Sequence, residues 1–263
     1  MGSQSARSPW FYIPKPRPEA GLRLFCFPYA GGGITPFLPW ASSLPDWLEV
    51  VAVQPPGRGL RMRERPFTRL EPLVAGLQEV IAPLLDRPFV FLGYSLGALV
   101  AFELARARRA QGQSLPRALL VAARSAPQLP LAYPPTHALP LEPFVAELRR
   151  FNGTPEEVLQ NRELMELLLP VLRADLEVNE TYTHLPGPPL ELPIFAYGGV
   201  EDPRCSPERL EAWGELTRGG FTMKLVQGGH FFIQTHGELL LHWLVEDLQQ
   251  LGLAAPLQGP AGG

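Results

Sequence analysis

One pentapeptide, Gly93–Gly97 (GYSLG), has the residue types and spacing of a serine nucleophile in its turn. It directly follows an apolar run typical of a β-strand, residues 88–92, and directly precedes a helical stretch, residues 96–109. Strand, tight turn and helix form a nucleophile elbow, in which small residues let the strand and the helix pass closely. The pattern predicts that Ser95 presents its hydroxyl at a helix N-terminus, where backbone N–H groups are unpaired.

A serine hydroxyl is a weak nucleophile and needs a base. His230 follows a predicted strand, residues 221–226, and the glycine pair before it places it in a loop. That loop lies at the carboxyl edge of the sheet, as Ser95 does, and active sites of open α/β sheets form there. We therefore predict His230 as the base. His236 and His242 lie within or beside the last predicted helix, and His137 and His184 belong to residues 127–189, so we expect other roles for all four.

The base needs an acid to orient it, which in this order of residues lies between the serine and the histidine. The strand at residues 192–197 is followed by Glu201 and Asp202. We predict Asp202, because a short carboxylate before a proline can be held rigidly, and Glu201 remains the alternative. Asp175 falls in a predicted helix, where we expect it to be solvated.

A tetrahedral intermediate needs two N–H donors. One is predicted to be the amide of Leu96, the residue after the nucleophile. The second is expected in the glycine-rich turn after the strand at residues 22–27. Ala30 is our choice there, with Tyr29 and Gly31 as alternatives.

Short apolar strands alternate with helices along the chain, so we predict an α/β fold with a mostly parallel sheet and helices on both faces. The predicted strands and main helices are 22–27, 49–53, 68–85, 88–92, 96–109, 117–123, 192–197, 221–226 and 236–251. A flexible segment, 1–20, is expected before one domain, 21–252, and a disordered tail, 253–263, after it.

One segment breaks this alternation, because residues 127–189 contain helices with no strand between them. An insertion late in a sheet, above the strand ends, favours a lid over the site. The alternative is a helical pair that only packs on the core. We call residues 127–189 the lid segment.

The composition is that of a globular protein: 263 residues, 46% apolar, 19% charged, with a net charge of −3. Scattered basic residues argue against a nucleic-acid surface. With no secretory signal and no apolar run long enough for a membrane span, we expect a cytoplasmic monomer without membrane contact. Of two cysteines, Cys26 is predicted to be a small core residue, and the state of Cys205 stays open. We predict no metal site.

Five motifs occur in a familiar order: Phe27–Gly32, Pro56–Arg58, Gly93–Gly97, Gly198–Asp202 and Gly228–Phe232. Together they resemble the type II thioesterases of nonribosomal-peptide and polyketide synthesis, and the related medium-chain acyl thioesterases of fatty-acid synthesis. The resemblance extends from about residue 22 to residue 251. The family often has two aspartates where this chain has Glu-Asp.

This resemblance implies an α/β-hydrolase that releases acyl or aminoacyl groups from the phosphopantetheine arm of a carrier protein, and so clears blocked or misprimed synthases. It implies Ser95, Asp202 and His230 as the catalytic residues, in agreement with the argument above. The substrate carries the phosphopantetheine, so no cofactor of the enzyme is expected. Docking of the carrier beside the lid segment is a hypothesis.

Two other functions remain open. A carboxylesterase or lipase acting on small free esters would use the same residues. A catalytically silent binding protein of this fold is disfavoured, because serine, acid and histidine are all present. The sequence gives neither the acyl-chain length nor the partner synthase.

Overall fold

The computed structural model describes residues 8–151 and 153–254. Its centre is a seven-stranded sheet in the order β1-β3-β2-β4-β5-β6-β7, in which β2 to β7 are parallel and β1 is antiparallel. The strands are β1 (Phe11–Tyr12), β2 (Leu22–Phe27), β3 (Leu48–Val53), β4 (Phe89–Tyr94), β5 (Leu119–Ala122), β6 (Ile194–Gly199) and β7 (Phe221–Val226). The predicted mostly parallel sheet is confirmed.

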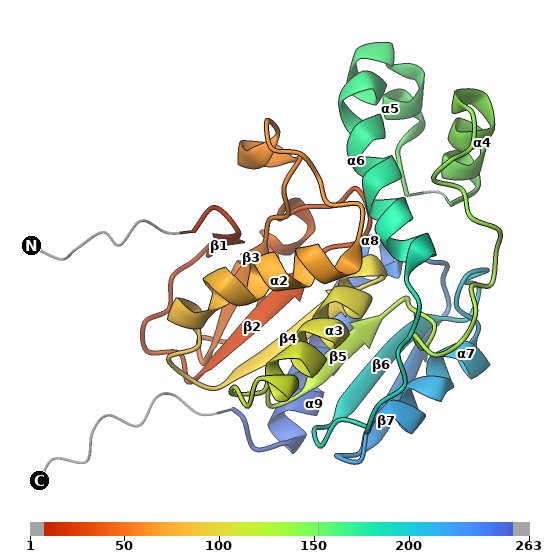
Figure 1. Cartoon of the computed structure of the whole chain (residues 1–263). Helices are drawn as coiled ribbons and strands as arrows, with labels where there is room; N and C mark the ends of the chain where they lie inside the picture. The colour runs from red at the N-terminus through yellow and green to blue at the C-terminus, as the bar shows by residue number, and fades with distance from the viewer. Residues whose placement is uncertain (1–7, 152, 255–263) are drawn as a thin grey trace, which may run out of the picture.

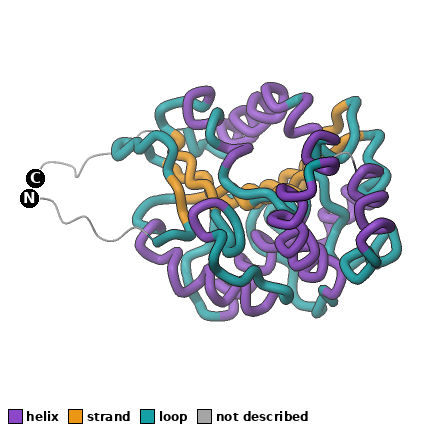
Figure 2. Tube along the Cα trace, turned by 90° about the horizontal axis from the view of Figure 1, so that it is seen from above, coloured by secondary structure: helices purple, strands orange, loops and turns teal. Residues whose placement is uncertain are grey.

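Helices cover both faces of this sheet (Figures 1 and 2). They are α1 (Trp40–Ser43), α2 (Leu70–Ile81), α3 (Leu96–Ala110), α4 (Leu141–Phe151), α5 (Glu156–Gln160), α6 (Arg162–Thr181), α7 (Pro207–Glu211), α8 (Phe232–Thr235) and α9 (Gly237–Gln250). No helix within the described ranges has both the length and the apolar character that crossing a bilayer requires.

Alternation of side chains along the buried strands divides the core into two layers. In β2, Phe25 and Phe27 face the layer under α2 and α3, whereas Leu24 and Cys26 face the layer that contains α9 residues such as Leu244. Successive strand side chains point to opposite faces, so a strand that is apolar throughout needs cover on both sides. Cys26 is fully buried, as predicted for a small core residue.

The helices α4, α5 and α6 of the lid segment form a third, smaller core (Figure 1). Phe144 and Leu148 of α4 pack there with Met165, Leu172 and Leu176 of α6. Ala30, in the turn after β2, packs against the same cluster. The lid segment therefore carries its own apolar interior and meets the domain beside a predicted N–H donor.

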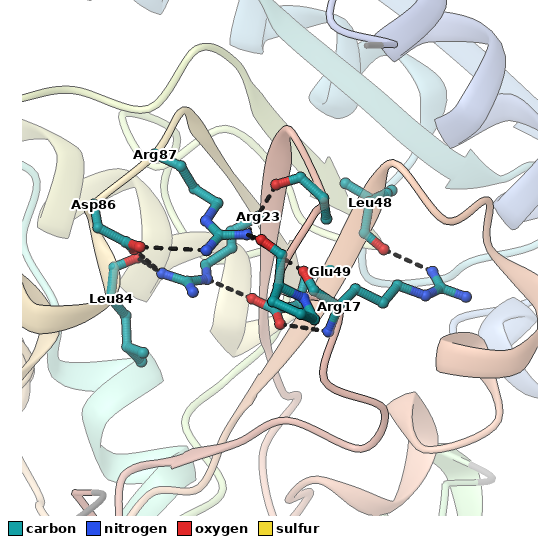
Figure 3. A network of polar contacts seen from close by, with 9 residues as sticks. Arg17, Arg23, Leu48, Glu49, Leu84, Asp86 and Arg87 are labelled. Atoms are coloured by element: carbon teal, nitrogen blue, oxygen red, sulfur yellow. Dashed lines mark hydrogen bonds and ion pairs between the residues drawn. The ribbon is translucent and has the colours of Figure 1, made fainter. Parts of the chain in front are cut away.

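Residues 8–20, which we predicted to be flexible, are instead tied to the sheet. β1 pairs with β3, and Trp10 is buried in the core layer under α2. Arg17 donates backbone and side-chain hydrogen bonds to Glu49, Leu48 and neighbouring carbonyl groups (Figure 3). Proline content suggested a loose segment, but buried contacts with distant residues order it. Residues 1–7, and the predicted tail from 255 onward, lie outside the described residues.

The same network fixes the amino ends of β2 and β3 (Figure 3). Arg23 of β2 donates to the Glu49 carboxylate at 2.6 Å and also pairs with Asp86. Arg87 donates to the carbonyl groups of Arg17, Pro18 and Ala20. This end of the sheet is therefore closed by ion pairs and hydrogen bonds, and the loops at the opposite, carboxyl end carry the candidate site.

Candidate active site

Ser95 occupies a strained turn between β4 and α3, with φ of 52° and ψ of −113°. A Cβ atom on Gly93 would overlap the carbonyl oxygen of Gly97, and one on Gly97 would overlap the carbonyl oxygen of Phe27. Both glycines are therefore required by the close approach of strand and helix. Strained backbone that persists at one residue is typical of functional sites. The turn projects the serine hydroxyl at the N-terminus of α3.

The structure brings the three predicted side chains together at the carboxyl edge of the sheet. His230 Nε2 lies 2.9 Å from Ser95 Oγ, and His230 Nδ1 lies 2.7 Å from Asp202 Oδ2. Asp202 is 4% exposed, and its other carboxylate oxygen accepts the backbone N–H of Arg204 at 2.8 Å. Glu201, the alternative acid, is exposed to solvent. This geometry allows the imidazole to take a proton from the serine while the aspartate fixes the ring.

Tyr94 supports His230 from behind and was missed in the sequence. Its hydroxyl donates to the His230 carbonyl oxygen at 2.6 Å and accepts the N–H of Ile233 at 3.2 Å. Burial raises the pKa of the Tyr94 hydroxyl well above its ordinary value, so it stays protonated and able to donate. An aromatic residue with a hydroxyl inside the GYSLG motif was the available signal.

Two backbone N–H groups close to Ser95, those of Leu96 and Ala30, are candidates for the oxyanion donors. Within the described ranges, neither Leu96 N–H nor Ala30 N–H donates a hydrogen bond to another residue. The Gly31 N–H, by contrast, donates to Asp175 at 2.7 Å. Gly31 is therefore occupied, and the choice for the second donor narrows to Ala30 or Tyr29.

Asp175 is buried, not solvated as we predicted. It is 6% exposed and forms a two-point ion pair with Arg58, with distances of 2.6 and 2.8 Å. Arg58 also donates to the Gly32 carbonyl oxygen at 2.8 Å. Since Asp175 lies in α6, the pair connects the lid segment to the glycine-rich turn. Asp175 follows Val171 and Leu172 at helical spacing, so the apolar stripe already indicated a buried position.

In the described part of the chain, neither His137 nor His184 contacts Ser95, and each has a partner of its own. His137 Nδ1 lies 2.7 Å from the Glu180 carboxylate, and His184 lies 3.1 Å from the Tyr182 hydroxyl. His236 directly precedes α9, and His242 lies within it. Cys205, whose state the sequence left open, is a buried free cysteine, and burial raises the pKa of its thiol to about 12.

Two pockets adjoin Ser95 and His230, and the lid segment contributes to both. One is lined by apolar side chains of the lid helices, Leu148 of α4 and Leu172 and Leu176 of α6. The other lies under residues 129–133. An acyl chain attached at Ser95 thus has two directions available, each bounded by residues between 127 and 189.

A serine elbow after a parallel strand, a histidine and an acid after later strands, and helices on both faces define an α/β-hydrolase fold. This is the fold class predicted from the sequence.

Comparison with known proteins agrees with this fold and narrows it. The chain belongs to the thioesterase family, whose domain model matches residues 22–246, and within it to the type II thioesterases of nonribosomal-peptide and polyketide synthase clusters. It is thus an enzyme that hydrolyses thioesters.

Three relatives illustrate the match. Gramicidin S biosynthesis protein GrsT of Aneurinibacillus migulanus is 43% identical over 240 residues, which cover 91% of this chain and 94% of the relative. The type II thioesterase BorB from the borrelidin biosynthetic cluster is 39% identical, with a TM-score of 0.82 and coverage of 91% and 97%. YbtT, a type II thioesterase from the yersiniabactin pathway, is 27% identical, with a TM-score of 0.83 and coverage of 92% and 99%.

Proposed function

We propose that this enzyme releases acyl or aminoacyl groups from phosphopantetheine thioesters on carrier proteins, and that it thereby clears misprimed polyketide or nonribosomal-peptide synthases. Membership of the type II thioesterases supports the substrate class. The hydrogen-bonded arrangement of Ser95, His230 and Asp202 carries the proposal. A cytoplasmic location and a monomeric state remain predictions from the sequence.

In the first half-reaction, Ser95 Oγ attacks the thioester carbonyl carbon while His230 Nε2 takes the hydroxyl proton. The oxyanion accepts hydrogen bonds from the Leu96 and Ala30 amides, which have no intramolecular acceptor within the described ranges. The carbon–sulfur bond then breaks. The pantetheine sulfur leaves with the proton from His230, and the acyl group stays on Ser95 as an ester.

In the second half-reaction, a water molecule gives a proton to His230 Nε2 and attacks the ester carbonyl. Collapse of the second tetrahedral intermediate breaks the bond to Ser95 Oγ, which recovers its proton from His230. The free acid leaves. Throughout, the buried Asp202 carboxylate keeps the proton on Nδ1 and stabilises the imidazolium. Apart from the attacking water, the groups that act in these steps are side chains and amides of the chain. The phosphopantetheine belongs to the substrate.

The carrier protein is proposed to dock beside the lid segment, because both pockets at Ser95 are bordered by it. A substrate bound to a bulky carrier needs an open surface around the path of its arm. If docking contributes, acyl-carrier protein should have a higher kcat/KM than the same acyl group on free pantetheine. Equal values would count against a docking surface.

The function is tested with a panel of acetyl-, propionyl-, aminoacyl- and medium-chain carrier proteins, compared with oxygen esters of the same acids. We expect release of free acid from the carrier thioesters at rates well above those of the oxygen esters, and loss of that release in Ser95→Ala. Preference for free oxygen esters would favour a carboxylesterase. Activity restricted to medium chains would favour a fatty-acid synthase partner.

A further inference from the structure

The pocket under residues 129–133 carries positive charge beside the nucleophile. Three arginines, Arg124, Arg204 and Arg209, line it together with Ser95 and His230. Within the described ranges, none of the residues that line it is an aspartate or a glutamate. Three guanidinium groups without a carboxylate are unusual at an acyl site, because an acyl chain of carbon and hydrogen gains nothing from them.

Arg204 is the central member of this group. Its guanidinium carbon lies 4.0 Å from the ring centre of Tyr133 and 3.1 Å from that of Phe151. The Nε and Nη2 atoms are out of contact with solvent and have no hydrogen-bond partner in the described part of the chain. Arg204 also lines the second pocket at Ser95. Its backbone is fixed by its hydrogen bond to Asp202, so the side chain starts from the active-site turn.

Neutral groups hold the other two arginines in place. Arg124 donates to the Asn179 side-chain oxygen, and Arg209 Nε donates to Ser125 Oγ at 3.0 Å. Burial lowers the pKa of Arg124 and of Arg204 from the ordinary value, but guanidinium groups remain protonated in proteins. All three therefore contribute a full positive charge.

No carboxylate in the described ranges forms a direct ion pair with these charges, although Glu180, Asp202 and Glu147 act on Arg204 from further away. Among the described residues, none lies within 4.0 Å of the guanidinium nitrogens of the three arginines. The carboxylates whose charge acts on Arg204 are each bound by another group: Glu147 by Arg150, Glu180 by Thr136 and His137, and Asp202 by His230. Since these guanidinium groups form no direct ion pair with a described residue, an anion entering this pocket can form charge-assisted hydrogen bonds with them.

We infer that this pocket binds a carboxylate on the acyl group, and that the preferred substrates include half-thioesters of short dicarboxylic acids. This inference rests on the proposed function. A pocket that contains Ser95 and His230 holds groups next to the reacting carbonyl. The phosphate of the pantetheine arm is separated from the sulfur by two amide units, so it is too far from the carbonyl to enter this pocket.

The test compares malonyl-pantetheine with 3-methylbutanoyl-pantetheine, in which two methyl groups replace the two carboxylate oxygens. The measured quantity is the ratio of kcat/KM for the two thioesters. Comparing this ratio between enzymes cancels the difference in their intrinsic reactivity. In Arg204→Met, we expect the ratio to fall about 10- to 100-fold, as expected for loss of a charge-assisted hydrogen bond. Arg204→Lys should recover part of it.

Two further variants complete the design. Arg209→Met should lower the ratio by a smaller factor, and it serves as a second probe if Arg204→Met folds poorly. Arg162→Met removes the same charge from an exposed position on α6, with 91% side-chain exposure, and should leave the ratio unchanged. This control separates a local contact from the effect of net charge.

Each outcome is decisive. An unchanged ratio in both Arg204→Met and Arg209→Met overturns the inference. The same thioesters are also measured on phosphopantetheine. If the arginine variants lose kcat/KM only on the phosphopantetheine thioesters, and equally for both acyl groups, the pocket binds phosphate and the inference is wrong. Failure to release either acid from the same thioesters on a carrier protein would instead contradict the proposed function.

Discussion

Two partly buried arginines lie beside the active site and differ in which groups their guanidinium nitrogens contact. Arg58 forms a two-point pair with Asp175 and donates to the Gly32 carbonyl oxygen. Arg204 is held between aromatic rings, with two nitrogen atoms unpaired among the described residues. The paired arginine connects parts of the fold, and the unpaired one is the contact that we propose for the acyl carboxylate.

The difference follows from the cost of burying charge. Removing one member of a buried ion pair leaves the other charge buried without a counter-ion, which lowers stability. Removing an arginine that has no ion pair leaves no such charge behind. Arg58 should therefore matter mainly for stability and for the position of the glycine-rich turn. Arg204 should matter mainly for the choice of substrate.

The largest expected effect concerns the hydrogen-bonded set of Ser95, His230 and Asp202, the last of which accepts the backbone N–H of Arg204. Asp202→Asn should lower kcat by roughly 10³- to 10⁴-fold, because the amide no longer stabilises the imidazolium or its tautomer. The matched control is Glu201→Gln, which changes an exposed neighbouring carboxylate and should leave kcat within about twofold. Turnover of an acyl-carrier protein measures both. The reverse pattern would assign the acid to Glu201.

The next effect tests the paired arginine. Asp175→Asn should lower the free energy of unfolding by about 3–5 kcal/mol, because Arg58 stays buried without its counter-ion. Denaturant unfolding measures this. In Arg58→Met/Asp175→Leu, stability should recover in part, while kcat should fall below that of the parent because the Gly31 N–H loses its acceptor and the glycine-rich turn its anchor. A single variant as stable as the parent would mean that the pair is solvated in solution.

The unpaired arginine should respond differently in the same unfolding experiment. Arg204→Met should change the free energy of unfolding by no more than about 1 kcal/mol, because the lost contacts with two aromatic rings are offset by relief of an unpaired buried charge. A loss as large as that of Asp175→Asn would show that Arg204 is structural, and would remove the contrast with Arg58.

The smallest effect concerns Cys205, next to the same turn. A thiol pKa raised to about 12 predicts no reaction of the folded protein with thiol reagents at neutral or mildly alkaline pH. Cys26 is fully buried and should behave likewise. Both thiols should react after unfolding. The sign of the linkage is fixed: between the ordinary value of 9.0 and about 12, the unfolded state loses the Cys205 proton first, so stability falls as pH rises. Rapid labelling of the folded protein would contradict the burial.

Much of the fold was predictable because its signals are local. Six parallel strands were recognised as apolar runs, with both ends of each within two residues of those observed. Strand β1 was missed because two residues carry no pattern. The order of residues 8–20 was missed for another reason: Trp10 is buried by distant residues, among them Arg61, whose guanidinium lies 4.1 Å from its ring centre.

The candidate site likewise has a part that the sequence predicts and a part that it does not. Ser95, Asp202 and His230 each follow a strand, and parallel strands end at one edge, so their proximity follows from position in the sequence. The Arg58–Asp175 pair joins residues 117 positions apart, and one sequence does not show which distant charges meet. The support that Tyr94 gives to His230 likewise depends on contact across 136 positions.

The central claim is that Ser95 carries the acyl group between two half-reactions. Rapid mixing with an acyl-carrier protein, acid quenching and intact-mass measurement test it directly. We predict a transient mass increase equal to the acyl group, located on the peptide that contains Ser95 and absent from Ser95→Ala, which should release no acid. Hydrolysis by Ser95→Ala at the parent rate, or an acyl group located on another residue, would contradict the account.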